Sequence, residues 1–364
     1  MAERPTYIVT GGAGFVGANL VAALLGRTPR PEVVVVDPLR SGSFANIVEA
    51  CERRGVGAFD GRVIAGSTAE ERVRGAMWEA RPAAIFHLGA ITDTTLADEA
   101  EMVRENVGGF DSLLARCAVD EVPLVYASSA ATYGTPPQAR DRQPFPVEAA
   151  GRPSNVYGFS KWLMEGEHRR FVEALGRSAL RADPDGHRPG GPAYPGAPHI
   201  VGLRYFNVFG PGEARKGKMA SMVYQLVRQM LAGGRPRVFT DGSQRRDQVY
   251  VDDVVDCTLA AAGLGSPALG GPTLRGGSSP GPGIYNLGSG VATSFNDIIA
   301  AVRGALGITE RDRPTEYFEM PPAIRAFYQD YTCADMSETE RGLGWKPKWK
   351  PAEAMAEYAR YLAR

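Results

Sequence analysis

Short runs of apolar residues recur along the first 206 residues, and longer stretches with a mixed, helix-like pattern separate them. Continuous apolar runs are typical of strands buried on both faces of a parallel sheet. Helices are expected at 15–25, 69–80 and 97–118, and around Tyr157 as far as about Gly176. This alternation predicts an α/β fold with a doubly wound, Rossmann-like parallel sheet, whose ligands bind at the carboxyl ends of the strands. The expected strands are 7–10, 33–37, 62–66, 83–90, 122–130 and 199–206.

The pattern changes after residue 206. A helix near 217–232, a short strand at 237–239 and a loop across GSQRRDQVYVDD (242–253) predict a smaller part of mixed structure, before the main sheet resumes near 284–288. Two Pro- and Gly-rich stretches, 177–199 and 265–283, are expected to be exposed loops. We therefore expect two interleaved domains. The larger comprises residues 1–206 with returning segments near 248–262 and 284–290, and the smaller comprises 207–247 and 291–364.

Composition narrows the class of partner. The chain has 364 residues, of which 44% are hydrophobic, and its 41 basic and 41 acidic residues give a formal net charge of +0. This balance gives no overall reason to expect nucleic acid or an anionic membrane as partner. The four cysteines form no CxxC pair, so we expect free thiols and no metal site. Because the N-terminus has no apolar leader and no apolar run reaches about 18 residues, we expect a cytoplasmic protein.

A glycine-rich turn, TGGAGFVG, joins the first expected strand to the first expected helix. Its glycines, Gly11, Gly14 and Gly17, have the spacing GxxGxxG rather than the GxGxxG of simpler dinucleotide-binding domains. Glycine lets the backbone approach a pyrophosphate, and the start of a helix offers it free N–H groups. The turn therefore predicts a dinucleotide site in the larger domain, with an ordinary tight turn as the alternative.

Two charged residues after the second strand bear on which dinucleotide binds. Asp37 ends this strand, and a carboxylate there usually accepts hydrogen bonds from the adenosine ribose, which favours NAD. Arg40 could instead meet the 2′-phosphate of NADP, or be a solvated loop charge. These two residues leave the choice open.

Tyr157 and Lys161 lie one helical turn apart in SNVYGFSK. A tyrosine hydroxyl has a pKa of roughly 10, and a neighbouring lysine would favour its ionised form. Ser128 and Ser129 end the strand at 122–130 on the expected cofactor side, where a hydroxyl can donate to a substrate oxygen. A single YxxxK is common by chance, but here it follows a glycine turn and a strand-end SSA. The combination predicts hydride chemistry on an alcohol.

The ordered set TGGAGFVG, YASSAATYG, NVYGFSK and RYFNVFGP resembles the extended short-chain dehydrogenase/reductase family, which acts on nucleotide sugars. Within it, FHLGAITDTT and GLRYFNVFGPGEARKGKMASM resemble the ADP-L-glycero-D-manno-heptose 6-epimerases of lipopolysaccharide synthesis. The resemblance covers nearly the whole chain apart from the two Pro- and Gly-rich stretches. It implies a homo-oligomer, a pentamer if like the family, that binds NADP, with NAD as the alternative.

The resemblance also implies a mechanism. Hydride leaves C6 of the ADP-heptose, an aldehyde forms, the C5–C6 bond rotates, and hydride returns to the other face. Tyr157 and Lys216 would be the two acid/base groups, Ser129 the hydroxyl, and Lys161 the group that orients the ribose and lowers the tyrosine pKa. A neutral Lys216 would need a lowered pKa, for example from burial near Lys218 or Arg215. Lys216 could alternatively bind phosphate or lie at the surface.

Further site residues follow from the resemblance alone. Those implied for the cofactor are Phe15, Val16, Leu88, Gly89, Ala90, Asn106 and Val208. Those implied for the substrate are Asn207, Lys218, Gln225, Phe239, Ser243, Arg246 and Tyr328. The sequence departs from the family pattern, near the expected cofactor or sugar, at Leu88, Ile91, Thr92, Lys218 and Gln225.

Three alternative activities, within and outside the family, differ in the residues that they need. A 4,6-dehydratase would need an acid and a base after the strand-end hydroxyl, where this chain has Ala130 and Ala131, and alanine moves no proton. A 4-epimerase needs only the Ser/Tyr/Lys set and stays open, although KGKMAS argues against it. A regulator that binds NADP without turnover would not need a positioned base, so the intact Ser129, Tyr157 and Lys161 argue against it.

Overall fold

The centre of the fold is a seven-stranded parallel sheet in the order β10-β6-β5-β4-β1-β2-β3. The computed structural model describes residues 4–93, 96, 98–136, 138–180, 198–265, 281–321 and 328–364. Most of the two Pro- and Gly-rich stretches expected to be loops lies outside these residues. The strands are β1 (Thr6–Thr10), β2 (Glu32–Asp37), β3 (Arg62–Ala65), β4 (Ala84–His87), β5 (Leu124–Ser129), β6 (Ile200–Tyr205) and β10 (Gly283–Leu287). The predicted α/β, doubly wound class is confirmed.

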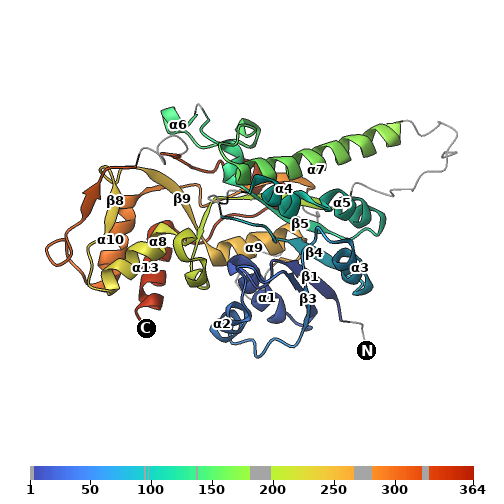
Figure 1. Ribbon diagram of the computed structural model, residues 1–364, viewed down its shortest axis with the longest axis horizontal. Helices are drawn as coiled ribbons and strands as arrows, with labels where there is room; N and C mark the ends of the chain where they lie inside the picture. The colour runs from blue at the N-terminus through green and yellow to red at the C-terminus, as the bar shows by residue number, and fades with distance from the viewer. Residues whose placement is uncertain are drawn as a thin grey trace.

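Helices cover both faces of this sheet. They are α1 (Phe15–Leu25), α2 (Phe44–Arg54), α3 (Glu71–Glu79), α4 (Glu99–Val107), α5 (Phe110–Val119), α7 (Val156–Leu180) and α9 (Val251–Ala261). Successive strand residues point to opposite faces. Val9 of β1 therefore packs into the core with α1, α2 and α9, whereas Ile8 packs into the core with α3, α5 and α7. Figure 1 shows α1 and α2 on one side of the sheet and α4, α5 and α7 on the other.

A smaller part, at the left of Figure 1, carries its own core. Its strands are β7 (Asn207–Phe209), β8 (Arg237–Phe239), β9 (Arg245–Tyr250), β11 (Ala292–Ser294) and β12 (Glu316–Phe318), and its helices are α8 (Met222–Leu231), α10 (Phe295–Leu306) and α13 (Pro351–Leu362). Strands β11, β9 and β7 form one sheet, and β12 pairs with β8. Apolar residues of α8, α10 and α13 pack on Phe209 and Tyr250. The remaining short elements are η1 (Ala130–Tyr133), α6 (Gln138–Asp141), η2 (Val147–Ala149), η3 (Ala214–Met219) and α12 (Ser337–Leu343).

The strand order brings the candidate residues to one edge of the large sheet. Strand β1 lies between β4 and β2, so the connections after β1 and β4 diverge at their carboxyl ends, the place where ligands bind in open sheets of this kind. Gly11 follows β1, Asp37 ends β2, Leu88 follows β4, Ser129 ends β5 and Asn207 comes soon after β6. Residues far apart in the sequence therefore meet at one place.

Three expected elements differ in the structure. The helix expected at 97–118 is two helices, α4 and α5, because Gly109 adopts a φ of +78° between them. The helix expected at 217–232 begins only at Met222, after the N-cap Ser221, and is preceded by the tight turn η3. The loop expected at 242–253 is instead strand β9 followed by the start of α9. Helix α2 was not expected at all.

Candidate active site

The glycine turn after β1 is shaped for close backbone packing. Gly11 has a φ of +65°, and a Cβ on Gly17 would lie 2.1 Å from the carbonyl oxygen of Gly11. Helix α1 starts at Phe15 with Gly14 as N-cap, and its described first turn contains no acidic residue and no side-chain cap. The N–H groups at this helix start are therefore available to an anion, which fits the pyrophosphate of a dinucleotide.

Asp37 and Arg40 follow β2 but differ in their surroundings. The Asp37 carboxylate is buried and accepts hydrogen bonds from the backbone N–H groups of Ala13 (3.0 Å) and Leu39 (2.8 Å). A carboxylate has about four acceptor positions, so ribose hydroxyls can also bind it. The guanidinium of Arg40 forms an ion pair with Glu101 of α4. Arg40 is therefore neither a purely solvated charge nor free to bind phosphate without competition.

Asn106 holds the loop after β4 in place. Its side-chain oxygen accepts the N–H of Ile91 (2.7 Å), and its amide donates to the carbonyl of Ile91 (3.0 Å) and to the hydroxyl of Ser160 (3.0 Å). Asn106 was expected among the cofactor residues. The structure shows it joining the loop that carries Leu88, Gly89 and Ala90 to the helix that carries Tyr157.

The buried side chains of Thr10 and His87 also hold the loop after β4 in place. The Thr10 hydroxyl accepts the N–H of Gly89 (3.0 Å) and lies 2.9 Å from Nδ1 of His87. Burial lowers the pKa of His87 to about 3, and the positive charge of Lys161 lowers it further. The imidazole is therefore neutral at neutral pH, and its Nδ1 shares a hydrogen bond with the Thr10 hydroxyl, in which the tautomer decides which group donates.

The Ser129 side chain interacts with the Tyr157 hydroxyl and lowers the pKa of this phenol. Ser129 ends β5 and also accepts the N–H of Ala131 (3.1 Å), while Tyr157 lies in the first turn of α7. Burial raises the pKa of Tyr157, and the Ser129 bond opposes this effect. The expectation that the tyrosine pKa is lowered is therefore wrong for the protein alone. The predicted serine–tyrosine pair is present.

Lys161 is buried one turn after Tyr157. Its Nζ donates to the carbonyl of Ala127 (2.8 Å) on β5, next to the strand-end serines. Burial lowers the pKa of Lys161 to about 8, and the charge of Glu165 opposes this shift. The ammonium is therefore still the main form at pH 7.

Lys216 lies close to the start of the cofactor helix. Its Nζ is 5.4 Å from the ring centre of Phe15, and the neighbouring Arg215 binds Glu49 of α2 through two bonds of 2.9 and 2.6 Å. Burial lowers the pKa of Lys216, and the charge of Glu213 opposes the shift. A pKa of Lys216 lowered by burial was expected. The expected contribution of Arg215 or Lys218 to this shift was not confirmed, and the Nζ of Lys218 pairs with Oδ2 of Asp93 at 3.7 Å.

Arg246, Tyr328 and Phe239 form one cluster in the smaller part. The guanidinium of Arg246 lies 4.8 Å from the ring centre of Tyr328, whose ring meets that of Phe239 edge-on at 5.9 Å. Phe318, which the sequence did not single out, packs on Phe239 at 4.8 Å. Arg246 is almost fully buried, and burial lowers its pKa. A buried guanidinium that packs on Tyr328, with Phe239 and Phe318 next to that ring, suits an anionic group attached to a flat ring.

The remaining expected residues are less closely joined to these groups. Asn207 is exposed on β7, and Val208 packs at the edge of the large core. Gln225 donates to the carbonyl of Ala220 (2.9 Å) and so supports the turn that carries Lys216. Ser243 is exposed in the turn between β8 and β9.

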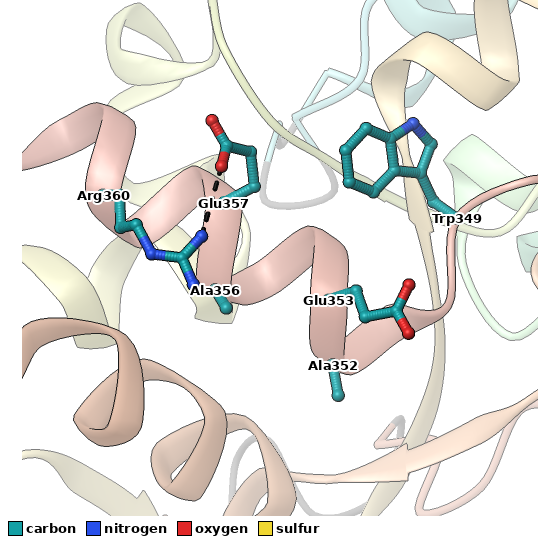
Figure 2. A pocket seen from close by; sticks show the side chains of 6 residues that line it. All are labelled: Trp349, Ala352, Glu353, Ala356, Glu357 and Arg360. Atoms are coloured by element: carbon teal, nitrogen blue, oxygen red, sulfur yellow. Dashed lines mark hydrogen bonds and ion pairs between the residues drawn. The ribbon is translucent and has the colours of Figure 1, made fainter.

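Other features of the described residues lie apart from this site. A shallow hollow runs along α13, and none of the expected site residues lines it; its walls are Trp349, Ala352, Glu353, Ala356, Glu357 and Arg360 (Figure 2). Within the described part of the chain, no helix combines the length and apolar character that crossing a membrane requires. The same residues bring together no group of three His, Cys, Asp or Glu side chains that could hold a metal ion.

Comparison with known proteins places this geometry in a family. The profile of the NAD dependent epimerase/dehydratase family matches residues 7–288. The chain belongs to this family. As a member, it is an epimerase-type enzyme that uses a nicotinamide cofactor.

Individual relatives agree with this assignment. The chain is 34% identical to an ADP-L-glycero-D-manno-heptose-6-epimerase of Cupriavidus pinatubonensis over 376 aligned positions, 98% of each chain. Its fold is similar to the crystal structure of Helicobacter pylori ADP-L-glycero-D-manno-heptose-6-epimerase, with a TM-score of 0.75, 29% identity, and coverage of 99% of this chain and 97% of that one. Thermotoga maritima UDP-glucose 4-epimerase, at 24% identity, TM-score 0.73 and 98% coverage of both chains, shares the fold.

Proposed function

We propose that this enzyme inverts C6 of ADP-D-glycero-D-manno-heptose to give ADP-L-glycero-D-manno-heptose. The observation that carries the proposal is the placement of two proton-transfer groups on separate elements. Tyr157 lies in the first turn of α7 and interacts with Ser129, whereas Lys216 lies in η3 with its Nζ over the ring of Phe15 at the start of α1. An epimerase that returns hydride to the opposite face of a carbonyl benefits from one such group on each side.

In the proposed reaction the bound nicotinamide would accept a hydride from C6 and later return it. Tyr157, as the phenolate, takes the hydroxyl proton from one C6 epimer, with Ser129 donating to the same oxygen. Lys216, as the ammonium, gives a proton to the reduced oxygen after the C5–C6 bond has rotated. The phenol then loses a proton to solvent and the neutral amine takes one up, so both groups return to their starting forms. C6 of a heptose is bonded to both C5 and C7, so its oxidation gives a ketone. The aldehyde inferred from the sequence is therefore wrong.

For substrate binding, we propose that Arg246 holds the diphosphate and that Phe239, Phe318 and Tyr328 line the nucleotide position. The Arg246 guanidinium is oriented by Tyr328, and an Arg fork matches the geometry of phosphate oxygens. In this division the large sheet binds the dinucleotide and the smaller part binds the sugar nucleotide. We further propose a cytoplasmic homo-oligomer, a pentamer if it follows the family, which analytical ultracentrifugation tests.

For the cofactor, the family resemblance implies NADP, whereas the residues after β2 favour NAD. The buried Asp37 carboxylate lies where a 2′-phosphate would be repelled, and Arg40 is paired with Glu101. Two negative charges about 4 Å apart near a protein surface repel by roughly 4 kcal/mol at an effective dielectric constant of 20. We therefore propose that NAD binds more tightly than NADP.

The test of the main proposal is direct incubation of the purified enzyme with ADP-D-glycero-D-manno-heptose, with the C6 configuration followed by NMR. The expected result is a mixture of both C6 epimers. Parallel incubations with UDP-glucose and GDP-mannose should show no inversion at any carbon. Inversion at C4 of UDP-glucose, with no change of the heptose, would instead show a 4-epimerase.

A further inference from the structure

A buried carboxylate, Glu165, lies behind the catalytic residues. Tyr157, Lys161 and Glu165 follow one another at four-residue spacing on α7, so they share one face of the helix. Glu165 is fully buried, and one of its oxygens accepts the hydroxyl of Ser128 at 2.6 Å. Ser128 directly precedes Ser129, the residue whose side chain lowers the pKa of Tyr157.

Arg204 of β6 completes an ion pair with this carboxylate. Its Nε and Nη2 donate to the two oxygens of Glu165 at 2.8 and 2.7 Å, and Arg204 is 1% exposed. The remaining nitrogen, Nη1, donates to the carbonyl of Val147 (2.6 Å) and to the hydroxyl of Tyr133 (3.0 Å). Tyr133 in turn donates to the side chain of Asn286 on β10 at 2.6 Å. The pair therefore ties together α7, β5, β6, β10, η1 and η2.

A buried ion pair of this kind is a poor device for stability alone, because well-packed apolar side chains often stabilise a core as much or more. We infer that this pair orients the neighbouring side chains and supplies a negative charge near Lys161. Each contact fixes a group next to the catalytic hydroxyls: Ser128 on one side of Ser129, and the turn η1, whose last residue is Tyr133, on the other.

We propose that Glu165 and Arg204 act as a positioning pair, which holds Ser129 and Lys161 in line with the Tyr157 hydroxyl. The proposal rests on the proposed function only for its turnover assay. Glu165 touches neither reacting atoms nor cofactor in this scheme. It acts through Ser128 on the serine and through its charge on the lysine.

The charge effect has a defined sign. The ionisable groups that interact with Lys161 are Glu165 on its own helix and His87 on β4, and His87 is neutral above a pH of about 3. Around Glu165 lie Arg204, Arg169, Tyr126 and His168; the pKa of His168 is lowered to about 4 by burial, so it too is neutral at pH 7. Glu165 is therefore the anion that keeps Lys161 protonated against the effect of burial.

The first test compares Glu165→Gln with a matched control, Glu167→Gln, on the same helix. Glu167 faces α5, beside Asp111 and Leu114. Glu165→Gln should move the alkaline limb of the kcat–pH profile down by about one pH unit, since an opposite charge nearby typically shifts a pKa by one to three units. Glu167→Gln should leave that limb in place. An unshifted limb with wild-type kcat in folded Glu165→Gln would overturn the proposal.

A second pair of variants guards against misfolding of Glu165→Gln. Arg204→Lys keeps the positive charge but loses the two parallel hydrogen bonds to Glu165. Ser128→Ala keeps the ion pair but removes the hydrogen bond between Glu165 and the residue before Ser129. Both should lower kcat, by up to about 10²-fold, the loss that a misplacement of about 1 Å can cause, with KM and the alkaline limb unchanged. Wild-type kcat in both would exclude the mechanical role.

The pH dependence of NADH binding, read by fluorescence, needs no sugar substrate. If the wild-type enzyme binds NADH but does not convert ADP-heptose, the proposed function fails. The positioning pair is still tested, because Glu165→Gln should shift the alkaline loss of NADH binding downward and Glu167→Gln should not. An identical binding profile in both variants would overturn the charge role.

Discussion

Ser129, at the end of β5, interacts with Tyr157, in the first turn of α7, and lowers the pKa of its phenol. In the proposed mechanism both hydroxyls act on one substrate oxygen at the carboxyl edge of the sheet. A proton leaving that oxygen would then meet a base and a donor that already have fixed positions.

Tyr157→Phe should keep cofactor affinity and lose epimerisation by at least about 10²-fold, the usual effect of removing an acid/base group. The phenyl ring fills the same space, so the fold should be unchanged. Epimer ratios by NMR and NADH binding by fluorescence measure the two effects separately. Near-normal turnover would refute the role of the tyrosine.

Lys216→Met should slow the reaction from one C6 epimer more than from the other, because Lys216 serves one face of the ketone. Initial rates from each purified epimer, with deuterated cofactor to follow hydride return, give the comparison. Lys350→Met is a suitable control, since Lys350 is 81% exposed and pairs only with Glu353 among the ion pairs of the described residues. Equal losses in both directions would mean that Lys216 only binds substrate.

The wild-type enzyme should bind NAD⁺ at least about 10-fold more tightly than NADP⁺, a difference of about 1.4 kcal/mol. Asp37→Asn should narrow this ratio by removing the repulsion, and Glu101→Gln should raise NADP⁺ affinity by releasing Arg40. Titration calorimetry with both cofactors measures each constant. Tighter binding of NADP⁺ by the wild type would show that Asp37 does not repel the phosphate.

Arg246→Ala should raise KM for the sugar nucleotide about 10-fold or more with little change in kcat, because a hydrogen bond to a charged group contributes about 1.5–3 kcal/mol. Arg245→Ala is the matched control, since Arg245 is its neighbour on the opposite face of β9. Steady-state kinetics of both variants measure KM and kcat for the sugar nucleotide. An unchanged KM in Arg246→Ala would place the diphosphate elsewhere.

Stability should fall as the pH drops from about 6.5 towards 4, because two histidines are buried in neutral form. Burial lowers the pKa of His87 to about 3 and that of His168 to about 4, so the unfolded chain binds more protons in this window. Burial raises the pKa of Asp253 to about 6. Between about pH 6 and pH 4 the folded state therefore binds a proton at Asp253 that the unfolded chain does not, which offsets part of the loss of stability.

The histidine contribution can be isolated by chemical denaturation at several pH values. His168→Gln should flatten the pH slope by up to one proton, about 1.4 kcal/mol per pH unit. The glutamine can still form a hydrogen bond with the Tyr126 hydroxyl, which lies 3.1 Å from Nδ1 of His168 in the wild type. A slope equal to that of the wild type would mean that His168 is already protonated in the fold.

Several parts of the site could be predicted from the sequence because their chemistry needs a local pattern. The glycine turn, the strand-end Ser129 and the Tyr157–Lys161 pair each lie within a few residues of a strand or helix end. Arg204 and Glu165 were not foreseen, since a buried ion pair between distant elements leaves no local spacing. Only an arginine within an otherwise apolar strand hinted at a buried partner.

The elements that were wrong share a physical cause. Strand β9 has the sequence RRDQVY, a polar pattern that is typical of a loop. Its Arg246, Asp247 and Gln248 are nevertheless buried. Their burial becomes possible only through partners elsewhere: the Asp247 carboxylate, for example, accepts the N–H groups of Ser289 and Ala334. Tertiary hydrogen bonding therefore overrode the local polarity.

The Arg215–Glu49 pair fastens the turn that carries Lys216 to helix α2. Helix α2 begins a few residues after Asp37, the residue proposed to bind the adenosine ribose. The proposed second proton-transfer group is therefore linked through one ion pair to the helix beside that residue. We expect a change of the nucleotide bound at Asp37 to shift the position of the Lys216 ammonium through α2.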